Sequence, residues 1–93
     1  MARVYQTRDM GMADIRAALV DHPGEADLCV LRVGSWGFAN GDARWYICRN
    51  RQDAQVCVWF GSRGMAEVKI CFVSDHTQAG WKTAHRLRGR FSR

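Results

Sequence analysis

Apolar residues in this chain come in short runs that are separated by turns rich in glycine, serine, asparagine and aspartate. Three of these runs occupy residues 28–31, 56–60 and 68–73. They are rich in β-branched and aromatic residues and are shorter than most helices, which is typical of strands. Several are apolar at both alternating positions, as expected of strands that are covered on both faces. The pattern therefore predicts buried strands joined by tight turns.

The runs and turns recur about every 13 residues, and an alanine marks each recurrence. The anchor alanines are Ala13, Ala26, Ala39, Ala54, Ala66 and Ala79, with spacings of 13, 13, 15, 12 and 13 residues. Four residues before them stand Asp9, His22, Ser35, Asn50, Ser62 and Asp75, most of which are good caps for a helical turn. Directly after them stand Asp14, Asp27, Asn40, Gln55, Glu67 and Gly80, none of which is apolar. We therefore predict about six turn-then-strand units, in which each alanine lets its turn approach a neighbouring strand closely.

The first and last units are less regular than the others. Residues 15–19 have a helix-forming composition, and residues 81–87 are compatible with either a helix or a strand. A two-residue insertion at Asn40-Gly41 displaces the third run. No linker divides the chain, and units this short must pack on one another to bury their apolar faces. Residues 1–93 are therefore expected to form a single domain.

Four segments of the chain resemble one small bacterial family. They are residues 25–28, 39–46 (Ala-Asn-Gly-Asp-Ala-Arg-Trp-Tyr), 62–66 and 78–82 (Gln-Ala-Gly-Trp-Lys). The chain is similar to septoil-knotted domains, which are tied as a seven-crossing torus knot and have no assigned biochemical function. The resemblance runs from Val4 to about Lys82 and implies a compact, deeply knotted α+β monomer. It brings no catalytic, cofactor or ligand residue, and residues 34–38 depart from the family's most regular pattern, which leaves the shape of the third turn open.

Composition indicates an ordered protein whose excess charge lies at one end. The chain is 47% apolar and has a formal net charge of +5. Its last twelve residues, the basic tail (82–93), contain five basic residues and no acidic one, whereas the rest holds nine of each sign. The beginning lacks the apolar stretch of a secretory signal, and no run is long enough to span a membrane. These features predict a cytoplasmic protein, whose cysteines stay reduced.

The candidate reactive groups do not form a catalytic pattern. Four cysteines lie in apolar runs without the paired spacing of zinc ligands, so we expect buried thiols and neither a metal nor another cofactor. They are Cys29, Cys48, Cys57 and Cys71. His22 and His76 each follow an aspartate, which can orient an imidazole as a general base. Because no activated nucleophile accompanies them, the sequence predicts a protein that is not an enzyme; a small enzyme using these histidines and a cysteine is the third alternative.

The basic tail is the strongest functional signal in the sequence. Its candidate anion-binding residues are Lys82, Arg86, Arg88, Arg90 and Arg93. Together with His85 and Phe91 they combine positive charge with rings, as nucleic-acid contacts often do. The same pattern fits a solubilising terminus, or a final helix that lies on the body with its arginines outward. The four tryptophans are expected in the core rather than as stacking platforms.

The sequence therefore favours a non-enzymatic structural or interaction module, monomeric and with an unidentified partner. The resemblance to a knotted family makes mechanical and kinetic stability its expected property. The alternative is a protein that binds RNA or another polyanion weakly through the basic tail.

Overall fold

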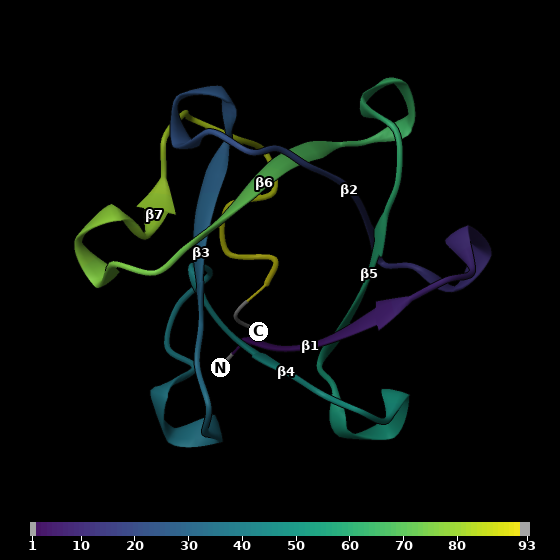
Figure 1. Ribbon diagram of the computed structural model, residues 1–93. Helices are drawn as coiled ribbons and strands as arrows, with labels where there is room; N and C mark the ends of the chain where they lie inside the picture. Colours follow the sequence, from purple (N-terminus) through teal and green to yellow (C-terminus); the bar gives the residue numbers. More distant parts are fainter. Residues whose placement is uncertain (1, 92–93) are drawn as a thin grey trace.

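A closed ring of parallel strands forms the body of the molecule (Figure 1). The computed structural model describes residues 2–91, in which the ring contains β1 (Ala2–Thr7), β2 (Ile15–Leu19), β3 (Leu28–Arg32), β4 (Arg44–Ile47), β5 (Val56–Phe60) and β6 (Val68–Val73). Their order is β4-β1-β5-β2-β6-β3, and a pairing of β3 with β4 closes the ring. The short strand β7 (Gly80–Trp81) pairs antiparallel with the start of β3. The described residues thus form a six-stranded parallel barrel with one short antiparallel addition.

The chain passes around this ring in two interleaved laps, β1–β3 and then β4–β6. Apart from the closing pair β3 and β4, no strand of residues 2–91 pairs with the strand before or after it. Each lap instead pairs with the other: the start of β1 pairs with β4 and its end with β5. The carbonyl of Val4 accepts from the N–H of Cys48, and that of Arg3 from the N–H of Gln55, both at 2.8 Å. Successive carbonyls of a strand point to opposite edges. Cys48 and Gln55 therefore lie at opposite edges of β1, and the second lap passes from one edge of β1 to the other between them.

The links between strands are single 3₁₀ turns, so the expected α+β class is wrong. The turns are η1 (Met10–Met12), η2 (Pro23–Glu25), η3 (Trp36–Phe38), η4 (Arg51–Asp53), η5 (Arg63–Met65) and η6 (His76–Gln78). Each link of six to eleven residues holds a single three-residue 3₁₀ turn, and none of them contains an α-helix within residues 2–91. Residues 15–19, despite their helix-forming composition, form β2, because pairing on both edges outweighs a weak intrinsic propensity. In residues 2–91 the molecule is therefore all-β, with a parallel barrel.

The repeat seen in the sequence marks the boundaries of these turns. Each residue four positions before an anchor alanine is the N-cap of a turn, and each alanine is the C-cap, with its N–H donating to the carbonyl of the first turn residue. The turn over residues 36–38 is a 3₁₀ turn like the others, which answers the question left open for residues 34–38, but its C-cap Ala39 (ψ 71°) departs from the extended backbone of the other five C-caps. Only Asp9 and Asp75 cap with their side chains, to the N–H groups of Gly11 (2.9 Å) and Thr77 (3.0 Å). Ala26 and Ala39 are buried, but the other anchors are half-buried, so close packing at every alanine does not hold.

The hydrophobic core fills the inside of the barrel. Its buried members are Ala2, Val4, Ile15, Ala17, Leu28, Val30, Trp45, Val56, Val58, Val68, Ile70, Leu87 and Phe91. Trp45, which is fully buried, contacts the rings of Phe60, Phe72 and Phe91 with centroids 5.1–6.3 Å apart. A second cluster lies outside the sheet and consists of Val20, Ala26, Cys29 and Cys71. Strands covered on both faces explain why their sequences are apolar at both alternating positions.

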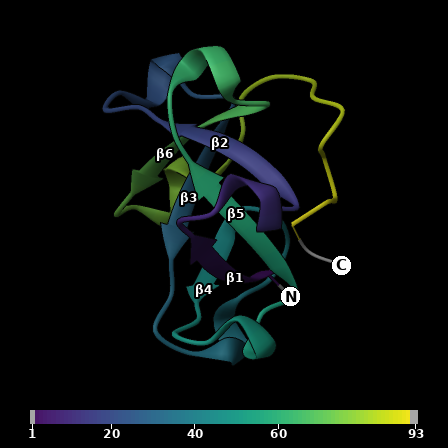
Figure 2. The same cartoon turned by 90° about the vertical axis from the view of Figure 1, so that its right-hand side faces the viewer.

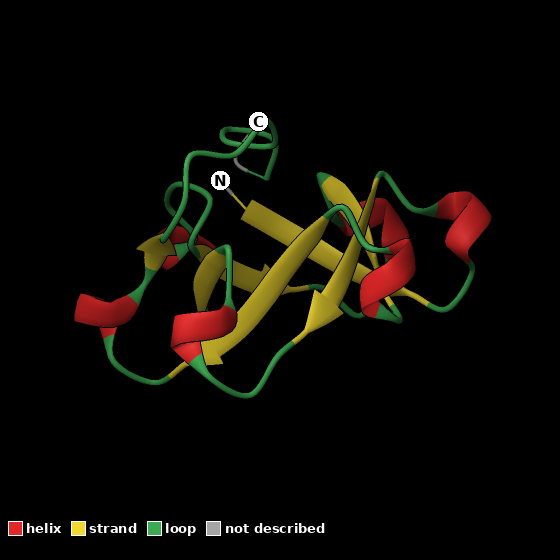
Figure 3. Cartoon of the chain, turned by 90° about the horizontal axis from the view of Figure 1, so that it is seen from above, coloured by secondary structure: helices red, strands yellow, loops and turns green. Residues whose placement is uncertain are grey.

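The turns and the C-terminus occupy different parts of the surface. The six described turns project outward around the rim of the ring, like the points of a star (Figure 1). The chain after β7 follows a separate path along one side of the strands (Figure 2). Seen from above, it lies across one end of the barrel, close to the N-terminus (Figure 3). No helix among the described residues has the length and apolar character that a membrane crossing requires.

Candidate functional site

The basic tail is not a free extension, because residues 82–91, here called the C-terminal segment, are anchored on the barrel. Leu87 and Phe91 are 1% and 0% exposed and belong to the core. Phe91 stacks on Trp45 with ring centroids 5.1 Å apart and an interplanar angle of 30°. Burying two large apolar side chains contributes about 1.5–3 kcal/mol each. The C-terminal segment therefore closes one end of the barrel, and we also call it the plug. Within the described residues it contains neither a helix nor a strand after Trp81.

Asp42 anchors the plug. Its carboxylate accepts from the indole N–H of Trp81 (2.8 Å) and from the backbone N–H groups of Phe91 (3.2 Å) and Gly89. Its own carbonyl accepts from the indole N–H of Trp45 at 2.6 Å. Hydrogen bonds to an ionised acceptor are roughly twice as strong as neutral ones. The Gly-Asp-Ala-Arg-Trp-Tyr motif thus links the wall of the barrel to its C-terminal plug.

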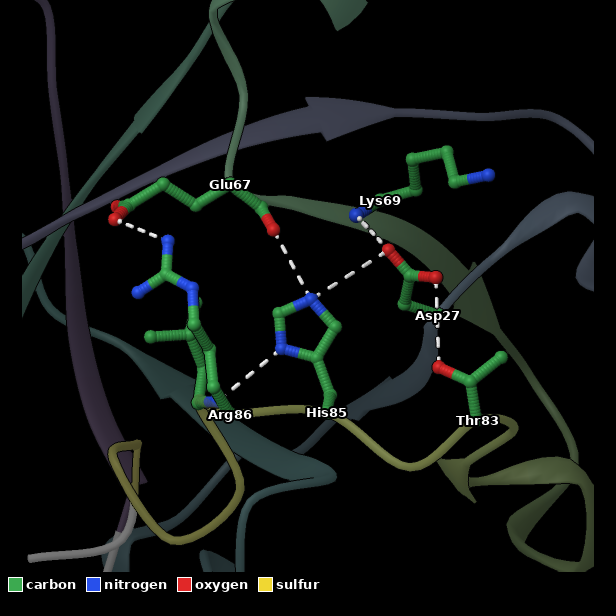
Figure 4. A network of polar contacts seen from close by, with 7 residues as sticks. Asp27, Glu67, Lys69, Thr83, His85 and Arg86 are labelled. Atoms are coloured by element: carbon green, nitrogen blue, oxygen red, sulfur yellow. Dashed lines mark hydrogen bonds and ion pairs between the residues drawn. The ribbon is translucent and has the colours of Figure 1, made fainter.

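His85 joins the plug to both laps (Figure 4). Its Nδ1 accepts from the N–H of Leu87 at 3.1 Å, so Nε2 carries the hydrogen that it donates to the carbonyl of Glu67 at 3.0 Å. Nε2 also lies 3.9 Å from the carboxylate of Asp27. The imidazole stacks on Trp81 with centroids 5.3 Å apart. With a side chain only 15% exposed and both nitrogens engaged, His85 has a structural role in this network.

Arg86 is paired within the protein. Its guanidinium donates to Glu67 at 3.0 Å (Figure 4), and Glu67 also accepts from the backbone N–H of Arg16 at 3.1 Å. The N–H of Arg16, and after it the Arg86 guanidinium, lower the pKa of Glu67, whereas burial acts in the opposite direction. The positive charge of Arg86 is therefore partly neutralised and is less available to an outside anion.

Three of the other candidate anion-binding residues lie on the surface of the described structure. Lys82, Arg88 and Arg90 are exposed, and none of them forms an ion pair within residues 2–91. Their backbone is nevertheless held: Lys82 donates to Asp27, Arg88 to His85 and Arg90 to Leu87. Arg90 also lines a small cavity together with Asp14 and Gln55. Arg93 lies outside the described residues.

Four of the six residues directly after the anchor alanines bind the two laps together, a role that the sequence did not reveal. Each donates its backbone N–H to a carbonyl on the other lap and accepts, through its side chain, the N–H of that same residue. These clamps pair Asp14 with Cys57, Asp27 with Lys69, Gln55 with Arg3, and Glu67 with Arg16. Their side-chain bonds measure 2.9–3.5 Å. The only sequence signal was a column without apolar residues, and partners 42–52 residues away could not be read from it.

All four cysteines are buried free thiols; Cys29, Cys57 and Cys71 lie in strands, and Cys48 directly follows β4. Their exposed fractions are 0% for Cys29, 5% for Cys48, 7% for Cys57 and 3% for Cys71. Burial is the main cause that raises the pKa of the Cys48 and Cys71 thiols, and the nearby Asp53 and Cys29 add to it. A raised pKa leaves little thiolate, which is the reactive form. Within residues 2–91, no group of three or more His, Cys, Asp or Glu residues could hold a metal ion.

The turn histidines are exposed, whereas the four thiols are buried. His22 caps η2 through its backbone and is exposed. The ring of His76 lies 3.8 Å from Asp75, and both side chains are more than half exposed. The carboxylate of Asp75 accepts from the N–H and hydroxyl of Thr77, which lowers its pKa. This Asp-His pair therefore lies in solvent at the tip of a turn.

The tryptophans divide between the core and the surface. Trp45 is fully buried, and Trp59 and Trp81 are half-buried. Trp36 is 47% exposed, which departs from the expectation that tryptophans fill the core. Its turn also carries Phe38, which is 64% exposed.

Comparison with known proteins identifies the family. The family model described as the 7(1) septoil knot domain matches residues 1–82. No curated protein and no solved structure matches the chain. The match includes every strand and turn described above but ends before the buried residues of the plug. It confirms the resemblance predicted from the sequence, and because it covers most of the chain, this protein belongs to the septoil knot domain family.

Proposed function

We propose that this protein is a non-enzymatic structural or interaction module whose useful property is resistance to unfolding. The observation that carries the proposal is the interleaving of the two laps, in which β1 and β2 are each paired on both edges by strands of the other lap. No unit can leave the barrel without breaking pairs with strands more than 40 residues away. Membership in a knotted family supports slow unfolding further, since a threaded chain must also unthread.

Unfolding rates and degradation test this proposal. Urea-jump unfolding, followed by tryptophan fluorescence and extrapolated to water, is expected to give a rate near or below about 10⁻⁶ per second, the slow end for small domains. A C-terminal degradation tag recognised by an ATP-dependent protease should leave most of the chain undigested. The same tag on an ordinary domain of similar size is the control. Unfolding within seconds and complete digestion would contradict the proposal.

A second candidate function is weak binding of RNA or another polyanion through the C-terminal segment. The observation that favours it is the exposure of Lys82, Arg88 and Arg90 without ion pairs on a backbone that is already ordered. Because this backbone is already ordered in the free protein, less conformational entropy is lost when a partner binds. A variant with these three residues changed to glutamine should lose heparin binding. A variant with Arg8, Arg49 and Arg51 changed to glutamine, all exposed and outside the C-terminal segment, serves as the charge-matched control. Equal heparin affinity of the parent and the tail variant would contradict this function.

The catalytic alternative receives less support from the geometry. The thiols are buried, and His22 and His76 are exposed on separate turns. A nucleophile and its base must lie within hydrogen-bond reach of each other. An alanine scan of the two histidines against a hydrolase substrate panel tests this alternative. An activity that both substitutions abolish would support the enzyme.

A further inference from the structure

One turn of the rim exposes two aromatic rings next to an arginine that has no acidic partner within residues 2–91. Trp36 and Phe38 of η3 are 47% and 64% exposed. The Arg3 guanidinium lies over the Trp36 ring, 5.1 Å from its centre, and Tyr46 meets the same ring edge-on at 6.1 Å. We call these four residues the aromatic–arginine surface. It comes from β1, η3 and β4 and is separate from the C-terminal plug.

The backbone explains why these side chains meet. Arg3 and Tyr46 are direct neighbours across the pairing of β1 with β4. Their sequence neighbours Val4 and Trp45 belong to the core, so Arg3 and Tyr46 lie on the outer face. The N–H of Ala2 donates to the carbonyl of Ala39, directly after η3, at 3.1 Å. The sheet and the turn therefore hold the surface in place without any bound partner.

The fold does not explain the exposed rings. The equivalent positions of the other turns hold methionine, proline, arginine, histidine or acidic and amide side chains, and only η3 among the described turns carries two aromatics. Exposing large apolar rings gives up the free energy that burial would contribute. Contiguous exposed apolar side chains commonly mark interaction sites. The surface is thus suited to a partner that covers flat rings.

The charge of the surface selects the kind of partner. Arg3 takes part in none of the ion pairs within residues 2–91, and its Nε has no hydrogen-bond partner there. Arg44 lies two residues before Tyr46 on β4 and also forms no ion pair in this range. A second copy of this chain would bring equal positive charge, and the whole molecule has a net charge of +5. The partner is therefore negatively charged.

We propose that the aromatic–arginine surface binds single-stranded nucleic acid by stacking unpaired bases on Trp36 and Phe38. Arg3 and Arg44 then contact the phosphates of the same strand. Stacking on exposed rings combined with nearby positive charge is the usual way in which proteins hold single strands without reading their sequence. Bases within a duplex are already stacked, so a duplex should bind more weakly.

Fluorescence anisotropy with a short labelled oligouridine tests the proposal. Trp36→Ala and Phe38→Ala should each weaken binding about tenfold, whereas Trp36→Phe should restore most of it. The matched control is the double variant Met10→Ala with Met12→Ala, which removes exposed apolar side chains from η1 and should bind like the parent. Urea titration of each variant checks that the barrel is intact, and Phe38 has no core contact to lose.

Several outcomes would overturn the proposal. These are no binding by the parent, unchanged affinity of both aromatic variants, and equal affinity for a duplex of the same length. Preference for an acidic peptide over the oligouridine would assign the surface to a protein partner. If oligouridine affinity fell only in the variant with Lys82, Arg88 and Arg90 changed to glutamine, nucleic-acid binding would belong to the C-terminal segment. Because the two surfaces share no residue, each can fail while the other stands.

Discussion

At the scale of single residues, the polar side chains that matter most are acceptors for backbone N–H groups on the other lap. Glu67 is one example, since it accepts from Arg16 and Arg86 while its carbonyl accepts from His85. A buried backbone N–H group without a hydrogen-bond partner costs about 1–3 kcal/mol. Four residues of the column after the anchor alanines supply such partners with their side chains: Asp14, Asp27, Gln55 and Glu67. Their residue types were visible in the sequence, but their partners were set by the fold.

Glu67 should make stability depend on pH in the acid range. Its folded pKa lies below the usual value of 4.5, so its contribution is complete above that pH and is lost as the pH falls through the folded pKa. Glu67→Gln should lower the free energy of unfolding at neutral pH and flatten its decline between about pH 5 and pH 3. Urea titrations across this range measure both effects. Glu25→Gln is the control, because its pair with Arg63 is at least half exposed; equal flattening by this variant would contradict the assignment.

The anchor alanines differ in how much room they leave. Ala39 is 0% exposed and its backbone bonds both to η3 and to β1, whereas Ala66 is half-buried. Ala39→Leu should therefore overpack its site and lower the free energy of unfolding by about 1–3 kcal/mol. Ala66→Leu should cost clearly less. Urea titration of the two variants compares them directly, and equal costs would mean that burial of the alanine does not decide the outcome.

At the scale of elements, the sequence predicted the turns and strands well and their pairing poorly. The cap residues and alanines mark the ends of each turn because capping is local chemistry. Residues 15–19 were ambiguous, since their alanines favour a helix until strands from the other lap pair with them. The sequence identified the positive charges of the tail, at Arg86, Arg88 and Arg90 among others. It did not predict that Leu87 and Phe91, which lie beside them, are buried. The plug was missed because its anchor, Asp42, lies 47 and 49 residues away from the backbone N–H groups whose hydrogen bonds it accepts.

Removing Asp42 should release the plug and leave the barrel folded. Every strand pair of the described residues lies within residues 2–81, so releasing the plug breaks no strand pairing, although it removes the core contacts of Leu87 and Phe91. Asp42→Ala should therefore make trypsin cut at Lys82, Arg86, Arg88 and Arg90 much faster than in the parent, while the strands resist. Asp53→Ala is the control, because Asp53 is exposed on η4 and forms no ion pair within residues 2–91. Unchanged cleavage in Asp42→Ala would show that Leu87 and Phe91 hold the segment without it.

At the scale of the whole molecule, every strand pair within the described residues joins a strand of the first lap to a strand of the second lap or to β7. The closing pair of β3 with β4 joins residues 13 apart, and the other pairs join residues 42–53 positions apart. In an ordinary repeat protein each unit pairs with its neighbour in sequence, so partial structures can form. Here the chain must close long loops, and so lose conformational entropy, before its non-local contacts can form. This order of events predicts slow folding for a chain of this length. The unit of stability is the complete pair of laps.

Dividing the chain between the laps tests this dependence most directly. A cut between Asn40 and Gly41, both exposed, separates β1–β3 from β4–β7, and neither fragment contains a strand pair of its own. Each fragment alone should therefore give the far-ultraviolet circular dichroism of an unfolded chain. An equimolar mixture should recover the sheet signal at a rate that depends on concentration, because the pairs form between molecules. A matched cut between Arg49 and Asn50, which lie on the surface inside the second lap, should leave the first fragment with the native pairing of β1 and β3 with β4. Sheet signal from either lap alone would mean that strands pair within a lap, and resistance to unfolding would then have to come from something other than interleaving.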